Sequence, residues 1–151
     1  MNTWIWAANP LAQSVTEDEQ IRAARMGAVA LWLTAAKDAM LLVYLLGSIP
    51  LLTAATSAAG PNGAAISLGL MAVLVVIQIA AGLFQWKRAG TMVPIVAGML
   101  TAYALYQAGM KLAGGVGTLA MISIAIMVVA LVLHIAAVRG AMALEKRRAT
   151  A

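Results

Sequence analysis

Few side chains in this 151-residue chain could do chemistry, and most of them lie within long apolar stretches. The single histidine, His134, could bind a haem iron or a metal, or relay a proton. Its position near the end of an apolar stretch favours a plainer role, a hydrogen bond between helices. The chain supplies no second histidine for haem and no cluster of ligands for zinc at that depth. We therefore predict no cofactor and no metal, with haem at His134 as the disfavoured alternative.

Three further polar side chains lie inside apolar stretches and are candidates for intramembrane contacts or for a solute path. Gln78 lies near the middle of its stretch, where a glutamine more often links two helices and contributes ~0.6–2 kcal/mol. Tyr103 and Gln107 are four residues apart, so on a helix they share one face. They could line an outward-facing pocket, or form a hydrogen bond with water in the outer leaflet. Together with His134, these residues make up the predicted polar sites.

Lys37 and Asp38 form an internal charge pair with long uncharged stretches on both sides. We predict that this pair marks the cytoplasmic edge of the first membrane crossing. A lysine there can reach the headgroups along its apolar stem, and an aspartate costs less there than deeper in the membrane. The same cytoplasmic interface is predicted for Gln85, Lys87 and Arg88.

The composition indicates that lipid surrounds most of this chain. Hydrophobic residues make up 64% of it and charged residues 10%, with a mean hydropathy of +0.94. A soluble domain has about 45–50% apolar and about 25% charged residues. The net charge of +5 comes from cations that bracket the apolar stretches. The predicted partners are therefore the bilayer and its anionic headgroups rather than nucleic acid.

Four stretches reach the ~20 apolar residues that a helix needs to cross the hydrocarbon core. They cover 39–59, 64–86, 92–113 and 116–138. The breaks between them are short and rich in turn residues, which predicts antiparallel neighbours in an all-α, four-helix transmembrane bundle. All cations except Lys111 fall on one side of this arrangement, so the positive-inside rule places both termini in the cytoplasm.

Residues 1–38 are predicted to hold a further amphipathic helix. Thr16 and Glu19 fit a capping box, which starts this helix near residue 17. If it continued to the end of the first crossing it would be roughly 64 Å long, about twice the thickness of the hydrocarbon core. It could bend near Lys37 and lie in the interface, or project onto a partner. A third alternative is that 26–46 spans, which would bury the charge pair mid-membrane. The tryptophans of this segment favour the interface.

Residues 139–151 are predicted to form a basic cytoplasmic tail. Because catalytic motifs are absent from the sequence and small-residue helix faces are abundant, we favour a non-enzymatic role and leave enzymatic activity open. The favoured role is an accessory or scaffold subunit of a homo- or hetero-oligomeric complex in a bacterial inner membrane. One alternative is a small channel or carrier with Gln78, Tyr103, Gln107 and Asp38 as candidates along its path. The other is a haem- or quinone-associated subunit using His134.

Overall fold

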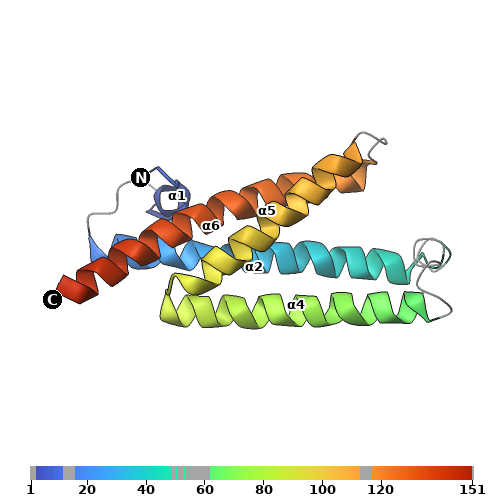
Figure 1. Cartoon of the computed structure of the whole chain (residues 1–151), viewed down its shortest axis with the longest axis horizontal. Coiled ribbons are helices and arrows are strands. Elements are labelled where there is room, and N and C mark those ends of the chain that lie inside the picture. The colour runs from blue at the N-terminus through green and yellow to red at the C-terminus, as the bar shows by residue number, and fades with distance from the viewer. Residues whose placement is uncertain are drawn as a thin grey trace.

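The computed structural model describes residues 3–11, 16–48, 50, 53, 62–112 and 117–150, and these are almost entirely helical (Figure 1). The helices are α1 (Thr3–Ala8), α2 (Glu17–Leu46), α4 (Gly63–Arg88), α5 (Met92–Leu112) and α6 (Thr118–Thr150). Four of them, α2, α4, α5 and α6, are long and apolar enough to cross a membrane. The predicted all-α class with four candidate crossings is therefore confirmed for the described residues.

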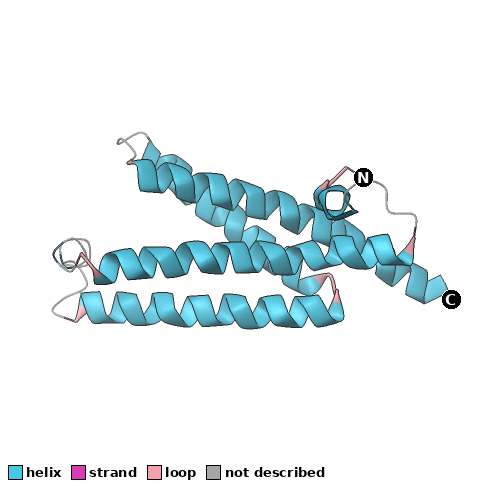
Figure 2. Ribbon diagram, turned by 180° about the vertical axis from the view of Figure 1, so that it is seen from behind, coloured by secondary structure: helices cyan, strands magenta, loops and turns pink. Residues whose placement is uncertain are grey.

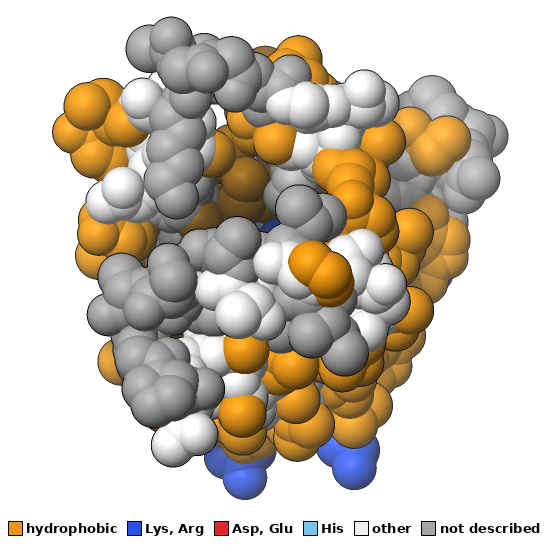
Figure 3. Space-filling view, turned by 90° about the vertical axis from the view of Figure 1, so that its right-hand side faces the viewer, with side chains coloured by type: hydrophobic (Ala, Val, Ile, Leu, Met, Phe, Trp, Pro, Cys, Tyr) orange, Lys and Arg blue, Asp and Glu red, His pale blue; other side chains and the backbone are white. Residues whose placement is uncertain are grey.

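The outer surface of the described helices is mainly apolar. Large hydrophobic side chains of α4, α5 and α6 are exposed, among them Leu70, Met99 and Ile122. The end-on view of Figure 3 shows hydrophobic side chains over most of the described surface. A soluble monomer rarely exposes continuous apolar patches of this extent. The surface thus fits helices that face lipid.

Helix α2 begins where the sequence predicts. The Thr16 hydroxyl accepts a hydrogen bond from the Glu19 N–H at 3.3 Å, and the Thr16 N–H donates to Glu19 Oε2 at 3.0 Å. These reciprocal bonds form the expected capping box. The helix then continues without a break past Lys37 and ends at Leu46, with Gly47 as its C-cap.

The first candidate crossing of the structure has other bounds than the predicted one. The predicted range 39–59 begins inside α2 and passes its end, whereas the candidate crossing is Glu17–Leu46. Most of the remainder of the predicted range lies outside the described residues. The predicted bend near Lys37 is also absent, because α2 is one continuous helix there. Residues 26–46, the span of the third alternative, lie within this helix.

The first half of α2 forms the centre of the bundle instead of a surface helix. Its buried residues run from Gln20 to Ala35 and are mostly alanine, glycine and other small residues. In lipid, small residues stabilise helix pairs because they allow the backbones to approach closely. A Cβ added at Gly140 of α6 would lie 2.7 Å from the Ala24 nitrogen and 2.9 Å from the Gln20 oxygen. Helices α2 and α6 therefore touch backbone to backbone.

Helix α4 lies along the other side of α2 (Figures 1 and 2). The contacts between them run in opposite order along the two helices. Gln85 of α4 bonds to Ala24 of α2, while Gln78 of α4 bonds to Asp38 of α2. The two helices are therefore held together at both levels by side-chain hydrogen bonds.

A tight turn joins α4 to α5. Ala89 caps α4 in the left-handed conformation, with φ of 50°, and its N–H donates to the Gln85 oxygen at 2.8 Å. Beyond the turn, α5 diverges from α4 and packs against α6 (Figure 1). Glu145 of α6 fixes the turn, since its Oε1 accepts hydrogen bonds from the N–H and the hydroxyl of Thr91.

A cluster of aromatic rings and one arginine joins α1, α2 and α4 at the same end of the bundle. Trp4 stacks on Trp86 with ring centroids 6.1 Å apart, and Trp32 lies 5.5 Å from the same ring. Arg25 Nε donates to the Trp86 oxygen at 3.1 Å, and its guanidinium lies 5.0 Å from the Trp86 ring. Tryptophans concentrate at membrane interfaces. This cluster, here called the tryptophan cluster, indicates the level of one interface.

The predicted basic tail is largely a continuation of α6. The helix runs through residues 139–150 to Thr150, and Gly140, Ala141 and Leu144 are buried. Leu144 packs in one cluster with Ala24 and Ala89. The first part of the predicted tail therefore belongs to the bundle, while the cations beyond it are exposed.

A polar pocket among the four long helices

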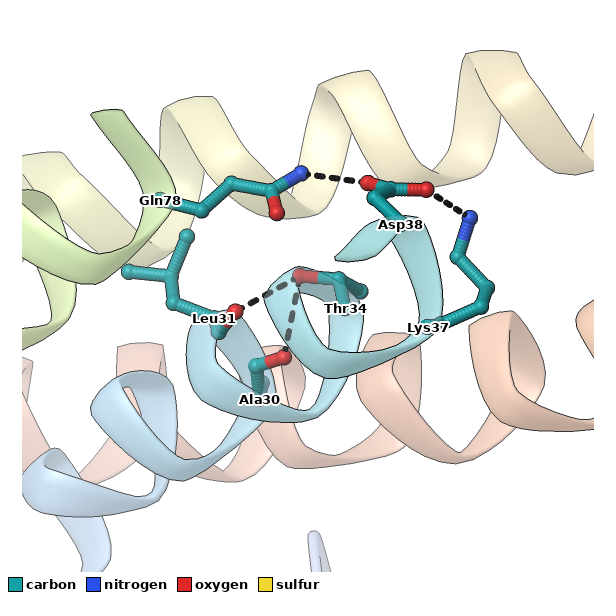
Figure 4. A network of polar contacts seen from close by, with 6 residues as sticks. All are labelled: Ala30, Leu31, Thr34, Lys37, Asp38 and Gln78. Atoms are coloured by element: carbon teal, nitrogen blue, oxygen red, sulfur yellow. Dashed lines mark hydrogen bonds and ion pairs between the residues drawn. The ribbon is translucent and has the colours of Figure 1, made fainter. Parts of the chain in front are cut away.

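A network of polar side chains connects α2 to α4 (Figure 4). Asp38 Oδ2 accepts a hydrogen bond from Gln78 Nε2 at 2.8 Å. The other carboxylate oxygen of Asp38 pairs with the ammonium group of Lys37. One turn earlier, the Thr34 hydroxyl donates to the backbone oxygens of Ala30 and Leu31, at 3.2 and 2.9 Å. The pair Lys37–Asp38 with Gln78 is here called the polar network.

The sequence places these groups together through helical spacing. Thr34 and Asp38 are four residues apart on α2 and therefore share a face, and that face meets Gln78 of α4. The side chains of Lys37 and Asp38 are only 16% and 13% exposed. Their charges are thus largely shielded by the bundle itself.

The hydrogen bond brings the charge pair to the level of Gln78, which the sequence predicts inside its apolar stretch. Gln78 lies about 12 Å along the helix axis from Trp86 of the tryptophan cluster, at 1.5 Å per residue. The hydrocarbon core is ~30 Å thick, so a group at this distance from an interface is near its middle. Because Asp38 bonds to Gln78, the two residues lie at one level. The sequence could not show that Asp38 contacts Gln78, because an adjacent Lys and Asp give the same sequence pattern inside a helix bundle and at a membrane border.

The polar network borders an open cavity of about 660 Å³ between α2, α4, α5 and α6. Most of its lining is apolar. Its polar or charged lining residues are Thr34, Lys37, Asp38, Gln78, Thr101 and His134. Small-molecule sites are commonly 300–1,000 Å³, mainly apolar, with a few well-placed polar groups. The cavity has the size and the chemical character of such a site.

His134 is the most unusual group of the cavity. Its side chain is 1% exposed, and neither ring nitrogen has a hydrogen-bond partner among the described residues. It also borders a second cavity of about 300 Å³ between α5 and α6. The predicted hydrogen bond from His134 to another helix is therefore not found among the described residues. A buried polar group without a partner costs ~1–3 kcal/mol and calls for a physical explanation.

Close packing fixes the position of His134. Gly98 of α5 faces it, and a Cβ at Gly98 would lie 3.3 Å from the His134 Cβ. The described residues hold no group of three or more His, Cys, Asp or Glu side chains that could bind a metal ion. The prediction on cofactors stays a prediction.

Tyr103 and Gln107 lie apart from this cavity. Gln107 Nε2 donates to the Tyr103 hydroxyl at 2.8 Å on the exposed side of α5. Neither residue is among those that line either cavity. The predicted i, i+4 pair therefore exists, but the structure does not bring it to Gln78 or His134.

Gln85, Lys87 and Arg88, which are predicted at the same membrane interface as the charge pair, have different environments. Gln85 is buried, and its Nε2 donates to the backbone oxygens of Ala24 and Gly90, both at 2.9 Å. Lys87 and Arg88 are exposed at the end of α4, and the Arg88 guanidinium lies 5.0 Å from the Phe84 ring. Gln85 is thus an internal link between α2 and the α4–α5 turn.

We expect Gln85→Leu to lower the free energy of unfolding by about 1–3 kcal/mol, because two backbone oxygens in the bundle lose their side-chain donor. Gln107→Leu is the matched control, since Gln107 is exposed and bonds only to Tyr103 among the described residues. Denaturant titration of both variants in detergent micelles measures the difference. Equal stability of the two variants would contradict the assigned role of Gln85.

Two residues of the cavity were missed as site residues from sequence. Thr34 precedes Asp38 by one helical turn, a spacing that could have drawn attention to it. Thr101 bonds its hydroxyl to the Ala97 oxygen at 2.8 Å and borders the cavity from α5. In the sequence it is one more small residue in an apolar stretch.

The described residues form helices, four of them able to cross a membrane, with a polar pocket between these four. These are the features of a multi-pass membrane protein. Comparison with protein-family models, with curated proteins and with solved structures finds no match. The functional interpretation therefore depends on the chemistry of the pocket.

Proposed function

We propose that this chain is a multi-pass protein of the bacterial inner membrane that binds a small molecule in the pocket between α2, α4, α5 and α6. The observation that carries this proposal is the position of the polar network on a cavity of about 660 Å³. Ionisable residues inside membrane bundles are rare and costly, and they commonly mark binding sites or pathways.

A purely structural role would explain less of this geometry. A bond between Gln78 and Asp38 alone could serve to link two helices. This link would not account for the cavity beside Gln78. It would also leave three buried atoms, the two ring nitrogens of His134 and Gln78 Oε1, without a hydrogen-bond partner among the described residues. A bound molecule with hydrogen-bonding groups would satisfy these atoms.

The proposed orientation places both termini in the cytoplasm. The start of α2, the end of α4 and the end of α6 lie at the same end of the bundle (Figure 1). These segments carry Arg22, Arg25, Lys87, Arg88 and the last cations of α6. The positive-inside rule supports a cytoplasmic location for such an end, and anionic headgroups are its proposed partners.

The binding role corresponds to the carrier that the sequence offered as an alternative. The accessory or scaffold role in an oligomeric complex stays a prediction, and a ligand-binding chain could also act within such a complex. An experiment on the isolated chain distinguishes the carrier role from the scaffold role, because a carrier binds its solute without other subunits.

Filling the pocket tests the proposal. Ala97 lines the cavity, whereas Ala80 is exposed on α4 and does not. Native mass spectrometry of protein extracted from its own membrane should show a small molecule bound to the wild type and to Ala80→Trp. Ala97→Trp should lose it. An identical set of bound molecules in all three proteins would contradict binding in this pocket.

We expect Gln78→Leu to weaken binding of the co-extracted molecule roughly tenfold, since one hydrogen-bonding group is worth about 1.4 kcal/mol. If the protein is a carrier, flux of that molecule into liposomes should fall with it. Gln107→Leu, on the exposed face of α5, is the control. Unchanged affinity in Gln78→Leu would remove the polar network from the binding site.

A further inference from the structure

The charges of the pocket select for a neutral occupant. Among the described residues that line it, the charged ones are Lys37 and Asp38, and they form an ion pair with each other. The lining therefore carries no net charge. An ionised ligand would have to leave water for this environment without a counter-charge, which is strongly unfavourable.

The walls of the pocket fit an apolar body. Leu74 and Ile77 of α4 face the cavity from one side, and Val93, Val96 and Leu100 of α5 from the other. Helices α4 and α5 meet at their turn and then diverge (Figure 1), and the cavity between them is open. Figure 3, which looks along the bundle, shows a hollow bordered by hydrophobic side chains at the end where α4 and α5 have separated. The divergence of α4 from α5 is therefore the feature that supports a lateral entrance between them.

His134 and Gln78 line the pocket, and each has a buried hydrogen-bonding atom without a partner among the described residues. A neutral imidazole has one N–H donor and one nitrogen acceptor, and in His134 both are buried without a partner among the described residues. A hydroxyl group can donate to one such nitrogen or accept from the other, and a carbonyl oxygen can accept. A molecule with a polar head of this kind would satisfy His134 while its body contacts the walls.

We propose that the occupant of this pocket is a neutral, lipid-soluble molecule that enters from the bilayer between α4 and α5 and hydrogen-bonds through a hydroxyl or carbonyl head to His134. This assignment rests on the proposed function and names its ligand class. It makes His134 the specificity-determining residue and α4 and α5 the walls that hold the apolar body.

The single histidine allows a direct test on the unmodified chain. Protein labelled with ¹⁵N-histidine and placed in lipid nanodiscs gives ring nitrogen signals from His134 alone. Dodecanol should shift these signals, because its hydroxyl bonds to the ring, whereas dodecane should leave them unchanged. Equal effects of both compounds, or no effect of dodecanol up to its solubility in the nanodisc, would overturn the hydrogen bond to His134.

Photolabelling locates the probe and separates this inference from the proposed function. Diazirine derivatives of dodecanol, dodecane and dodecanoate are compared at equal membrane concentrations. Labelling near Val96 is normalised to labelling of Val73, an exposed residue of α4 that does not line the cavity. The alcohol should label the pocket about fivefold to tenfold more than the alkane, the effect of one hydrogen bond. His134→Leu should abolish this preference and Tyr103→Phe should keep it.

Each other result has a distinct meaning. Equal pocket labelling by alcohol and alkane overturns the role of His134 and leaves binding in the pocket intact. Preferred labelling by dodecanoate overturns the neutral ligand class. Absence of pocket labelling by all three probes, together with unchanged co-extraction in Ala97→Trp, contradicts the proposed function itself.

Discussion

Asp38→Leu is expected to lower the free energy of unfolding by about 3–5 kcal/mol. The substitution leaves the Lys37 ammonium inside the bundle without its counter-charge, and removing one partner of a buried ion pair costs this much. It also removes the acceptor of the Gln78 amide, which bonds to Asp38 at 2.8 Å. Denaturant titration in detergent micelles, with helix content as the signal, measures the loss.

The size of the loss distinguishes a buried pair from an interfacial one. An ion pair in contact with water contributes about 0–1 kcal/mol, and this is the value expected if Lys37 and Asp38 lie at the membrane interface, as the sequence predicts. Asp18→Asn, an exposed acid in the first turn of α2, is the matched control and should cost less than 1 kcal/mol. If Asp38→Leu costs as little as this control, the pair is exposed to water and the depth inferred from Gln78 is wrong.

A double variant separates stability from binding. In Lys37→Leu/Asp38→Leu both charges are removed together, and replacing a buried ion pair by apolar residues is often neutral or stabilising. We expect this variant to recover most of the stability lost in Asp38→Leu. Because the polar network is gone, it should still fail to bind the co-extracted molecule. Retained binding would show that the pair serves folding alone.

The number and type of the long helices could be predicted because both depend on local composition. An apolar stretch of sufficient length predicts a crossing wherever it occurs, and the described residues contain four such helices. The start of α2 could also be predicted, since the capping box involves only Thr16 and Glu19, which are three residues apart in the sequence. Such features need no knowledge of the neighbouring helices.

The enclosure of the charge pair could not be predicted, for a physical reason. From sequence, Lys37 and Asp38 indicate a border, because isolated charges avoid the hydrocarbon core. Side by side on α2, however, they pair with each other, and Gln78 of α4 adds a hydrogen bond from 40 residues away. Only the tertiary contact with α4 shows that the pair is enclosed.

The same limit applies to the candidate site. The sequence predicts Gln78 as a polar site inside an apolar stretch, but it predicts the partner of Gln78, Asp38, at another level of the membrane. Tyr103 and Gln107 were correctly paired by helical spacing, yet the direction of their face depends on how α5 rotates against α6. Helical periodicity gives the angle between residues on one helix and leaves the rotation of that helix undetermined.

Gly140→Val is expected to destabilise the bundle by roughly 3 kcal/mol, at the upper end of the range for overpacked cores. Even the Cβ alone would lie 2.6 Å from the Ala23 Cβ, 2.7 Å from the Ala24 nitrogen and 2.9 Å from the Gln20 oxygen. Two of these atoms belong to the backbone of α2, so no side-chain rotation relieves the clash. Relief requires α2 and α6 to separate, and that weakens their contact along its length.

A series of glycine-to-alanine changes tests where the first half of α2 lies. Gly69 has no atom within 4 Å of an added Cβ, so Gly69→Ala should stabilise by about 0.5–1 kcal/mol through helix propensity. At Gly82 the nearest atoms belong to the Trp32 ring, which can move, and the effect should be intermediate. Gly140→Ala should be the most destabilising of the three. If 17–36 lay on the membrane surface away from α6, Gly140→Ala would instead behave like Gly69→Ala. Thermal unfolding of the three variants therefore decides between a central and an interfacial α2.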